Sequence, residues 1–267
     1  MKNFKLIRIR TLIIVIILTS TFNSCSTTQY LAYVDYAPKL PTENKDMGMV
    51  KVHMSELFKK NIKYNVVATD LKTNISFVSK DIFVLDDRIE FRRKNQQLIL
   101  NFPELLDRTI SVKGFTISID KYFSFSLNSD ITDAQSFADD LYFIQRQLIK
   151  SRFVSLLTKF EPIAAQYAAL KVKPPVSEDQ RKFIVQANSL NQQKEYGKAI
   201  ELYVKAIQLD PTAYPAGYYN IALLDAQLGY FENAIFEMKK YLLLMPDAPD
   251  ARSAQDKIYE WEIMISK

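Results

Sequence analysis

The sequence predicts an α+β protein in which a small antiparallel β-barrel or sheet domain, closed by a long helix, precedes an all-α repeat domain with a capping helix. Three observations lead to this fold class. Short segments rich in branched and aromatic residues crowd residues 64–127, apolar residues recur at helical spacing over residues 132–163, and six residue pairs match at an offset of 35 near the carboxy terminus. With 267 residues, 48% of them hydrophobic and 24% charged, the chain is long enough for two folded domains.

Seven segments within residues 64–127 have the composition of β-strands. Several alternate apolar and polar residues at a period of two, which is typical of a strand with one buried face. Turn-forming pairs such as Asp86-Asp87, Lys94-Asn95 and Lys113-Gly114 lie between them. We therefore predict a meander of six or seven antiparallel strands, drawn from Ile75–Val78, Ile82–Leu85, Ile89–Phe91, Gln97–Leu100, Ile110–Val112, Phe115–Ile119 and Phe123–Leu127.

A long helix is predicted directly after the last strand. Thr132 and Gln135 have the spacing of a capping box at its start. Pro162 is expected to kink the helix near its far end, and the segment with Pro174 and Pro175 ends it and forms a linker. The apolar residues that recur three or four positions apart are Phe137, Leu141, Ile144, Leu148, Leu156, Phe160 and Ile163.

The carboxy-terminal part of the chain repeats itself. Matching pairs at an offset of 35 are Phe183/Tyr218, Ala187/Ala222, Tyr196/Phe231, Ala199/Ala234, Ile200/Ile235 and Pro211/Pro246. The alanines let two helices of a hairpin approach closely, the aromatic residues fill the remaining space, and each proline ends a second helix. This pattern resembles the tetratricopeptide repeat, and the resemblance implies two helical hairpins that bind a protein or peptide segment.

A final helix is predicted after Pro246. Ile258, Trp261 and Ile265 recur at spacings of three and four, so Trp261 is expected to pack against the open end of the repeat array. Two repeats and a cap are few for independent stability. We therefore expect the long helix that precedes the linker to pack on the open first repeat.

The strand region and its closing helix resemble the pleckstrin-homology-like or GRAM-like superfold. The resemblance rests on residues 82–91, which read IFVLDDRIEF, and on the helix over residues 134–148 after the last strand. Basic residues gather here as Arg88, Arg92, Arg93 and Lys94. Two interpretations stay open: a solvated strand and turn, or a site for an anionic headgroup or acidic peptide.

The amino terminus reads as a targeting segment. Lys2, Lys5, Arg8 and Arg10 precede seven consecutive apolar residues, which is the pattern of a secretory signal and is too short for a transmembrane helix. The phrase Phe22-Asn23-Ser24-Cys25 follows and contains the only cysteine of the chain. It resembles the lipobox of bacterial lipoproteins, in a looser form like that of Bacteroidota. The resemblance implies acylation of Cys25 and attachment to a membrane; an incidental or buried thiol is the alternative.

Charge and the lipobox context indicate where the protein resides. The four cations before Cys25 account for most of the net charge of +5, since without them 31 basic residues face 30 acidic ones; a nucleic-acid partner is not expected. Ser26 follows the cysteine and no acidic run comes next, which favours the periplasmic face of an outer membrane. The expected domains are a signal peptide over 1–24, a tether over 25–47, the β domain with its helix over 48–170, a linker over 171–179, and the repeats with their cap over 180–267.

The residue inventory argues against catalysis. Five glycines and one histidine leave little from which to build a phosphate loop, a catalytic triad or a multi-histidine zinc site. His53 is expected to be structural, and the carboxylate pairs at Asp86-Asp87 and Asp139-Asp140 come with no second catalytic cluster. We therefore expect no enzyme activity, no catalytic residue, no metal and no cofactor.

The expected function is that of a lipid-anchored scaffold facing the periplasm, with the repeats binding a protein partner. The resemblance to the tetratricopeptide repeat places a concave groove on the first helix of each unit, with Ile184, Asn188, Asn191, Tyr219, Asn220, Leu223 and Gln227 lining it. Asn188 and Asn220 resemble asparagines that hold a peptide carboxylate in some family members, but the expected lysine is replaced by Ile184. An extended or helical partner segment fits better. The groove could also be merely solvated, and a second function stays open: a lipoprotein that binds a lipid or glycan in its β domain.

Overall fold

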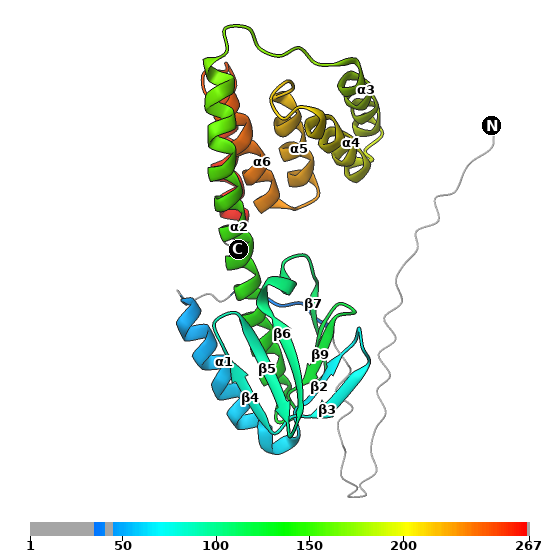
Figure 1. The fold of residues 1–267 in the computed structure, drawn as a ribbon, viewed down its shortest axis with the longest axis vertical. Helices are drawn as coiled ribbons and strands as arrows, with labels where there is room; N and C mark the ends of the chain where they lie inside the picture. Colours follow the sequence, from blue (N-terminus) through cyan, green and yellow to red (C-terminus); the bar gives the residue numbers. More distant parts are fainter. Residues whose placement is uncertain (1–34, 41–44, 266–267) are drawn as a thin grey trace, which may run out of the picture. The chain divides into compact units, whose positions relative to one another are not determined.

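The computed structural model describes residues 35–40 and 45–265, and within them it has the predicted order of a β-sheet region followed by helical repeats (Figure 1). The strands are β1 (Asp35–Tyr36), β2 (Val67–Asp70), β3 (Ile75–Val78), β4 (Asp81–Val84), β5 (Arg88–Arg93), β6 (Gln96–Asn101), β7 (Ile110–Lys113), β8 (Thr116–Ile119) and β9 (Phe123–Ser126). The helices are α1 (Met47–Asn61), α2 (Ile131–Ala169), α3 (Glu178–Gln192), α4 (Tyr196–Leu209), α5 (Ala216–Gln227), α6 (Phe231–Leu244) and α7 (Ala251–Ile265), with short 3-10 helices at Ile62–Tyr64 and Phe102–Leu105.

The strands form two antiparallel sheets that do not close into a barrel. The larger sheet has the order β1-β7-β8-β9-β2-β3, and the smaller has the order β4-β5-β6. In β7 and β9 every second residue is buried, because alternate side chains of a strand point to opposite faces. All seven segments predicted as strands lie on strands of the structure; β1 and β2 are additional.

Aromatic rings fill the space between the two sheets and the helices. The ring of Phe58 on α1 lies 5.6 Å from that of Phe91 on β5 and 4.7 Å from that of Phe137 on α2. Phe125 on β9 completes the cluster, with its ring 5.2 Å from Phe137. Burying rings of this size supplies much of the apolar area that stabilises the domain.

Helix α1 was not among the predicted elements. Asp46 caps its first turn by accepting a hydrogen bond from the backbone N–H of Met49. Its buried residues, Val50, Met54, Leu57, Phe58 and Asn61, share one face of the helix. The stretch predicted as a tether over 25–47 also includes strand β1, whose Asp35 and Tyr36 pair with Lys113 and Val112 of β7. That pairing places Asp35 and Tyr36 on the sheet, and the stretch ends at Met47, where α1 begins.

A buried polar cluster joins the end of α1 to the start of α2. Asn61, fully buried, donates to Leu57 O (2.9 Å) and to Asp133 Oδ2 (2.8 Å), and it accepts from the backbone N–H of Ser129 (2.8 Å). Asp133 also accepts from Lys60 Nζ at 2.8 Å. Burial alone would raise the pKa of Asp133, but hydrogen bonds from Lys60, Ser129 and Asn61 outweigh it and lower the pKa.

Helix α2 begins one residue earlier than its predicted cap. Asp130 is the N-cap, and its side chain accepts from the backbone N–H of Thr132, so the capping box predicted at Thr132 and Gln135 is wrong. Asp130 is the N-cap in place of Thr132 because its carboxylate accepts a hydrogen bond from a backbone N–H that has no partner within the helix. Its negative charge also lies at the positive end of the helix dipole. Leu156 and Ile163, predicted on the buried face, are instead 38% and 37% exposed.

The second half of α2 packs on the second repeat, not on the first as expected. Phe153 stacks on Phe236 of α6 with ring centres 4.4 Å apart, and Phe160 meets Tyr218 of α5 edge-on at 5.5 Å. Phe160, Ala164 and Tyr167 share one hydrophobic cluster with α5, α6 and α7, while the cluster of α3 and α4 contains no residue of α2. The apolar face of the second repeat thus supplies the partner that α2 needs.

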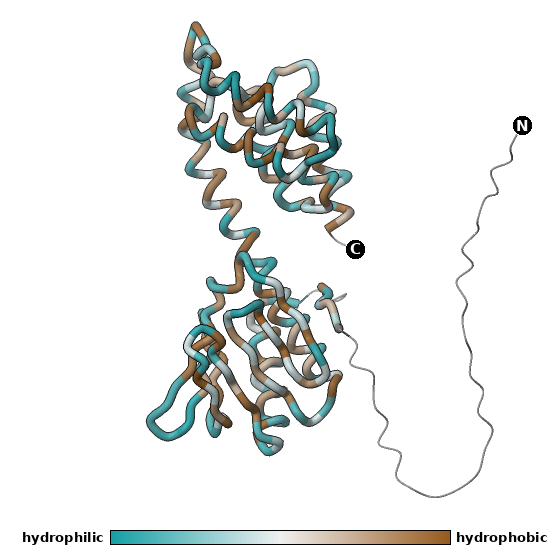
Figure 2. The backbone as a smooth tube through the Cα atoms, turned by 90° about the vertical axis from the view of Figure 1, so that its right-hand side faces the viewer, coloured by the Kyte–Doolittle hydropathy of each residue, from teal (hydrophilic) through white to brown (hydrophobic). Residues whose placement is uncertain are grey.

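The repeat helices pack as two hairpins and a cap. Ala187, Ala199, Ala222 and Ala234 are all fully buried, as their role in close helix packing predicts. Trp261 on α7 is 7% exposed and joins the cluster of the second repeat, so it packs where the cap was expected. Figure 2 shows hydrophobic and hydrophilic stretches alternating along these helices, the pattern of helices with one buried face.

Replacing Asn61 by alanine should destabilise the β domain by about 2–3 kcal/mol, because Asp133 and the Ser129 N–H lose a buried partner. Urea unfolding followed by far-UV circular dichroism measures the change. Asn95→Ala, an exposed change in the β5–β6 turn, is the control and should stay within about 0.5 kcal/mol. Equal stabilities for the two variants would contradict a structural role for the cluster.

Candidate functional site

The residues predicted to line the groove lie on α3 and α5, the first helices of the two hairpins. Asn188 and Gln227 are exposed, and the other five are half-buried. We call this set the groove face: Ile184, Asn188, Asn191, Tyr219, Asn220, Leu223 and Gln227. Its members are accessible enough to meet another molecule.

Three groove-face residues also have contacts inside the repeats. Asn188 accepts a hydrogen bond from Tyr203, which is buried at 1% exposure. Asn220 donates to the hydroxyl of Tyr214 at 3.2 Å, and the ring of Tyr219 packs edge-on against Tyr241 at 5.1 Å. The asparagines therefore brace the hairpins, so the groove's free chemistry rests more on Ile184, Leu223 and Gln227.

Helix α2 contacts the repeats away from the groove face. Its second half meets Tyr218, Phe236 and Met245, none of which belongs to that face. The ammonium of Lys240 on α6 lies 4.2 Å from the ring of Phe236 and 5.2 Å from that of Tyr218, which adds cation–π attraction at the same seam. These contacts of α2 involve no groove-face residue, although Tyr219 and Leu223 pack on the same hydrophobic cluster as the second half of α2.

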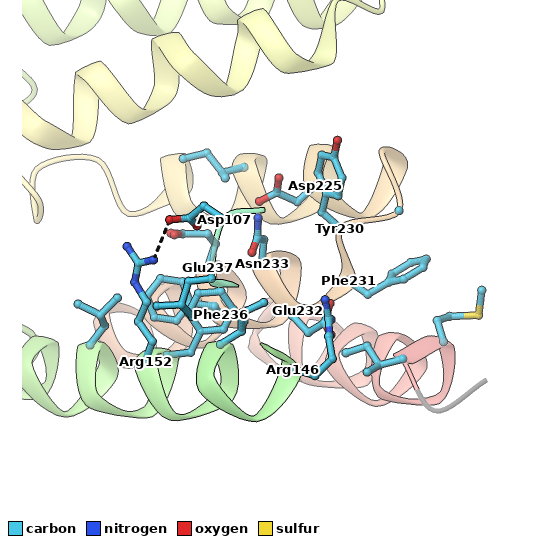
Figure 3. Close-up of a pocket in the computed structure, with 18 of the residues that line it drawn as sticks. Asp107, Arg146, Arg152, Asp225, Tyr230, Phe231, Glu232, Asn233, Phe236 and Glu237 are labelled. Carbon is cyan, nitrogen blue, oxygen red and sulfur yellow. Dashed lines mark ion pairs between the residues drawn. The ribbon is translucent and has the colours of Figure 1, made fainter. Parts of the chain in front are cut away.

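A second concave feature, which the sequence did not predict, lies between α2 and helices α4, α5 and α6. This pocket has a volume of about 1070 Å³ (Figure 3). Apolar side chains of α2, α4 and α6 form part of its wall, including Phe153, Val204 and Phe236. The loop that carries Asp107 also borders it, and Gln145 of α2 holds that loop by donating to the carbonyl oxygens of Leu105 and Arg108.

Carboxyl groups of the second repeat face this pocket. Asp225 on α5 is only 5% exposed, and Glu237 on α6 lies beside it (Figure 3). Burial, and next the charge of Glu237, raises the pKa of Asp225 to about 7. Burial also raises the pKa of Glu237, although the ammonium of Lys240 at 3.1 Å opposes that shift.

A comparison of the two repeats in sequence would have pointed to these two acids. At the offset of 35, Asp225 corresponds to Leu190 and Glu237 to Leu202. Both leucines are half-buried and pack on the core of the first hairpin. Apolar periodicity alone does not detect an acid that replaces a packing leucine in one of two repeats.

Two of the four clustered basic residues of the β domain, Arg88 and Arg92, form ion pairs within it. Glu90 on β5 is 3% exposed and is flanked on the same face by Arg88 and Arg92. Arg88 donates to Glu90 at 2.8 Å and Arg92 also pairs with it, and these bonds, that of Arg88 first, lower the pKa of Glu90. The arrangement favours a structural role for these two arginines over an anion site.

The sole histidine and the paired carboxylates have structural contacts. Asp140, with a 2% exposed side chain, lies 2.6 Å from His53 Nδ1 and 3.6 Å from Lys45. Asp139 accepts from the Tyr36 hydroxyl and from the backbone N–H of Lys39. Asp86 pairs with Lys51 and Asp87 with Arg88. Among residues 35–40 and 45–265, no group of three or more histidine, cysteine or acidic residues could hold a metal ion.

Comparison with known families supports the repeats. The family described as tetratricopeptide repeat matches residues 184–212 and 215–247, which correspond to the α3–α4 and α5–α6 hairpins. The predicted tetratricopeptide repeats are thereby confirmed. No solved structure matches the chain. This repeat is generally a non-enzymatic module for protein–protein interaction, which makes a protein-binding scaffold the general function of this region.

Cys25 and the predicted signal peptide lie outside the described residues. Across the part of the chain that the structure describes, none of the helices has both the length and the apolar character that a bilayer crossing requires. Lipid attachment at Cys25 remains a prediction.

The stability of the protein should depend on pH through Asp225. In the unfolded chain this carboxyl ionises near pH 3.8, but in the folded protein it keeps its proton up to about pH 7. The folded state binds more protons between these values, so the free energy of unfolding should rise by about 2 kcal/mol from pH 8 to pH 5.5 on this account. Asp225→Asn should lose that increment in urea titrations at the two pH values; identical pH slopes would contradict the prediction.

Proposed function

We propose that this protein is a lipid-anchored scaffold facing the periplasm, and that its groove face binds a segment of a protein partner. The observation that carries the proposal is the pair of tetratricopeptide hairpins, whose groove face keeps Asn188 and Gln227 exposed and Ile184 half-buried. Half-buried Ile184 and Leu223 offer apolar contact, and Gln227 offers an amide. An extended or helical segment with apolar side chains suits such a surface.

The proposed anchor is Cys25. Its support is the sequence: four cations, seven apolar residues, and then the only cysteine of the chain. Nine residues lie between Cys25 and Asp35 on β1, and an extended chain over these ten steps spans at most about 35 Å. An acylated Cys25 would therefore hold the β domain close to the bilayer. The resemblance of this domain to the pleckstrin-homology-like superfold remains part of the proposal.

The alternative function, a ligand held inside the β domain, finds less support. The rings of Phe58, Phe91, Phe125 and Phe137 are in mutual contact in its interior. A lipid or glycan fragment would have to displace them, at a cost of the apolar contacts that stabilise the domain.

Cys25→Ser should block lipid attachment and signal removal, because serine offers no thiol for acylation. We expect the variant to keep its signal segment, to run at a higher mass, and to incorporate no labelled palmitate in cells. Ser24→Ala, next to it, is the control and should leave processing unchanged. A mature, acylated Cys25→Ser protein would refute the anchor.

Partner binding should depend on the groove face. A photo-crosslinking amino acid at exposed Gln227 should capture the partner in cells, and Ile184→Lys should reduce that crosslink at least tenfold by placing a charge in the apolar contact. Leu209→Lys is the matched control: Leu209 is 54% exposed at the end of α4 and outside the groove face.

Circular dichroism and the thermal midpoint establish that both lysine variants stay folded. An unchanged crosslink in folded Ile184→Lys would show that the groove face is not the binding site. An equal loss in Leu209→Lys would point to the general surface of the repeats instead.

A further inference from the structure

Asp225 is a buried acid whose side chain has no hydrogen-bond or ion-pair partner among the described residues. It is 5% exposed, lines the pocket between α2 and the repeats, and faces it together with Glu237 (Figure 3). Its carboxyl oxygens reach the pocket rather than being enclosed. A largely buried carboxylate without a partner is nevertheless unfavourable, and proteins normally pair such a group.

The other charged residues that line the pocket are largely engaged elsewhere. Arg146 of α2 pairs with Glu232, and Arg152 of α2 lies 3.6 Å from Asp107. Glu237 has Lys240. The pocket thus has two arginines in ion pairs and an exposed lysine, Lys39, among its lining residues. None of these cations forms an ion pair with the carboxyl group of Asp225.

The repeat fold does not require an acid at this position. The corresponding residue of the first hairpin is Leu190, and that of Glu237 is Leu202, so the same helical geometry forms there with apolar side chains. A costly polar group that the fold does not need is typical of a site that a ligand completes.

We propose that this pocket binds an organic cation, an ammonium or guanidinium group on an apolar stem, with Asp225 as its ion-pair partner and Glu237 beside it. The wall residues Ile200, Val204 and Phe236 suit the stem, and the ring of Phe236 also suits a cation. The group can come from a free amine or from a lysine or arginine side chain of a partner protein. The site is distinct from the groove face, so the failure of either proposal leaves the other standing.

Binding should depend on the ionisation of Asp225. The charged or titratable groups around the pocket come from four parts of the chain: Lys39 after β1, Asp107 on the loop before β7, Tyr142, Arg146 and Arg152 on α2, and Tyr230, Glu232, Glu237 and Lys240 on or just before α6. The α4 residues at the pocket, Ile200 and Val204, do not titrate. With a pKa of about 7 in the empty site, the carboxyl is largely protonated at pH 6 and ionised at pH 8. Affinity for a cation should therefore be about tenfold lower at pH 6 than at pH 8.

Calorimetry with the full-length protein in detergent tests the proposal. The probes are n-butylguanidinium, the neutral n-butylurea, and the peptide acetyl-Ala-Arg-Ala-amide. We expect the two cations to bind at pH 8 and the urea not to bind. Tighter binding of the peptide identifies a partner side chain as the source, and tighter binding of the free cation identifies a small molecule. No binding of either cation at millimolar concentration overturns the proposal.

Three substitutions make the test specific. Asp225→Asn should abolish binding, and Asp247→Asn, which removes an equal charge from an exposed position, should retain it. Asp225→Leu, which copies Leu190, should also abolish binding while raising the thermal midpoint at pH 8 by a few degrees. A lower midpoint for Asp225→Leu would show that the acid serves the fold, and binding retained by either Asp225 variant would overturn the assignment.

Discussion

The structure depends on a single helix that belongs to two hydrophobic cores. The first half of α2 buries Phe137, Leu141 and Ile144 against the sheets, and the second half buries Phe160 and Tyr167 against the second repeat. No residue of α2 between Gln145 and Phe160 is buried. At 100° per residue, Phe160 points about 160° away from Ile144, so the two halves present nearly opposite faces. A helix of this length is held by packing at both ends rather than by propensity alone.

This arrangement explains which predictions succeeded. The repeats were predictable because close helix packing needs small residues at fixed spacing. Ala187 and Ala222, like Ala199 and Ala234, lie 35 residues apart and are visible in the sequence alone. The strands were predictable for a similar reason, since half-buried strands alternate in sequence as they do in space. The packing partner of α2 was not predictable, because apolar spacing tells that a face is buried but not against which neighbour. Exposed Leu156 and Ile163 show the same limit. At 100° per residue they lie within about 60° of buried Phe160 around the helix, yet they remain 38% and 37% exposed. Apolar spacing does not tell how far the neighbouring helices extend over a face.

Helix α1 and the pocket acid Asp225 were not predicted, because the sequence patterns used for the strands and repeats do not reveal them. Helix α1 has a regular buried face, but that face ends in the polar residue Asn61, and apolar Met49 and Val52 lie exposed outside it, which obscures the helical spacing of apolar residues. Asp225 was not predicted as a site residue because the comparison of the two repeats looked for positions where both carry similar residues, and Asp225 is a position where they differ. The two repeats can be compared with each other. Where one has a leucine and the other a buried acid, both positions belong to the same helical geometry, so the fold does not explain the acid. Such a difference locates a candidate site without any comparison to other proteins.

The two sides of the repeats have different relations to the rest of the chain. The groove face belongs to α3 and α5 alone, so its properties follow from the repeats by themselves. The pocket with Asp225 needs α2, because Phe153, Arg146 and Arg152 form part of its wall. The same helix also contributes to the β-domain core, and any change in how α2 lies on α6 would alter the pocket. The buried residues of the first half of α2 end at Gln145, and those of the second half begin at Phe160. These two residues lie about 22 Å apart along the helix axis, at 1.5 Å per residue. Over that distance α2 contacts the second repeat through Phe153 and lines the pocket, so the pocket wall includes the part of the helix that joins the two cores.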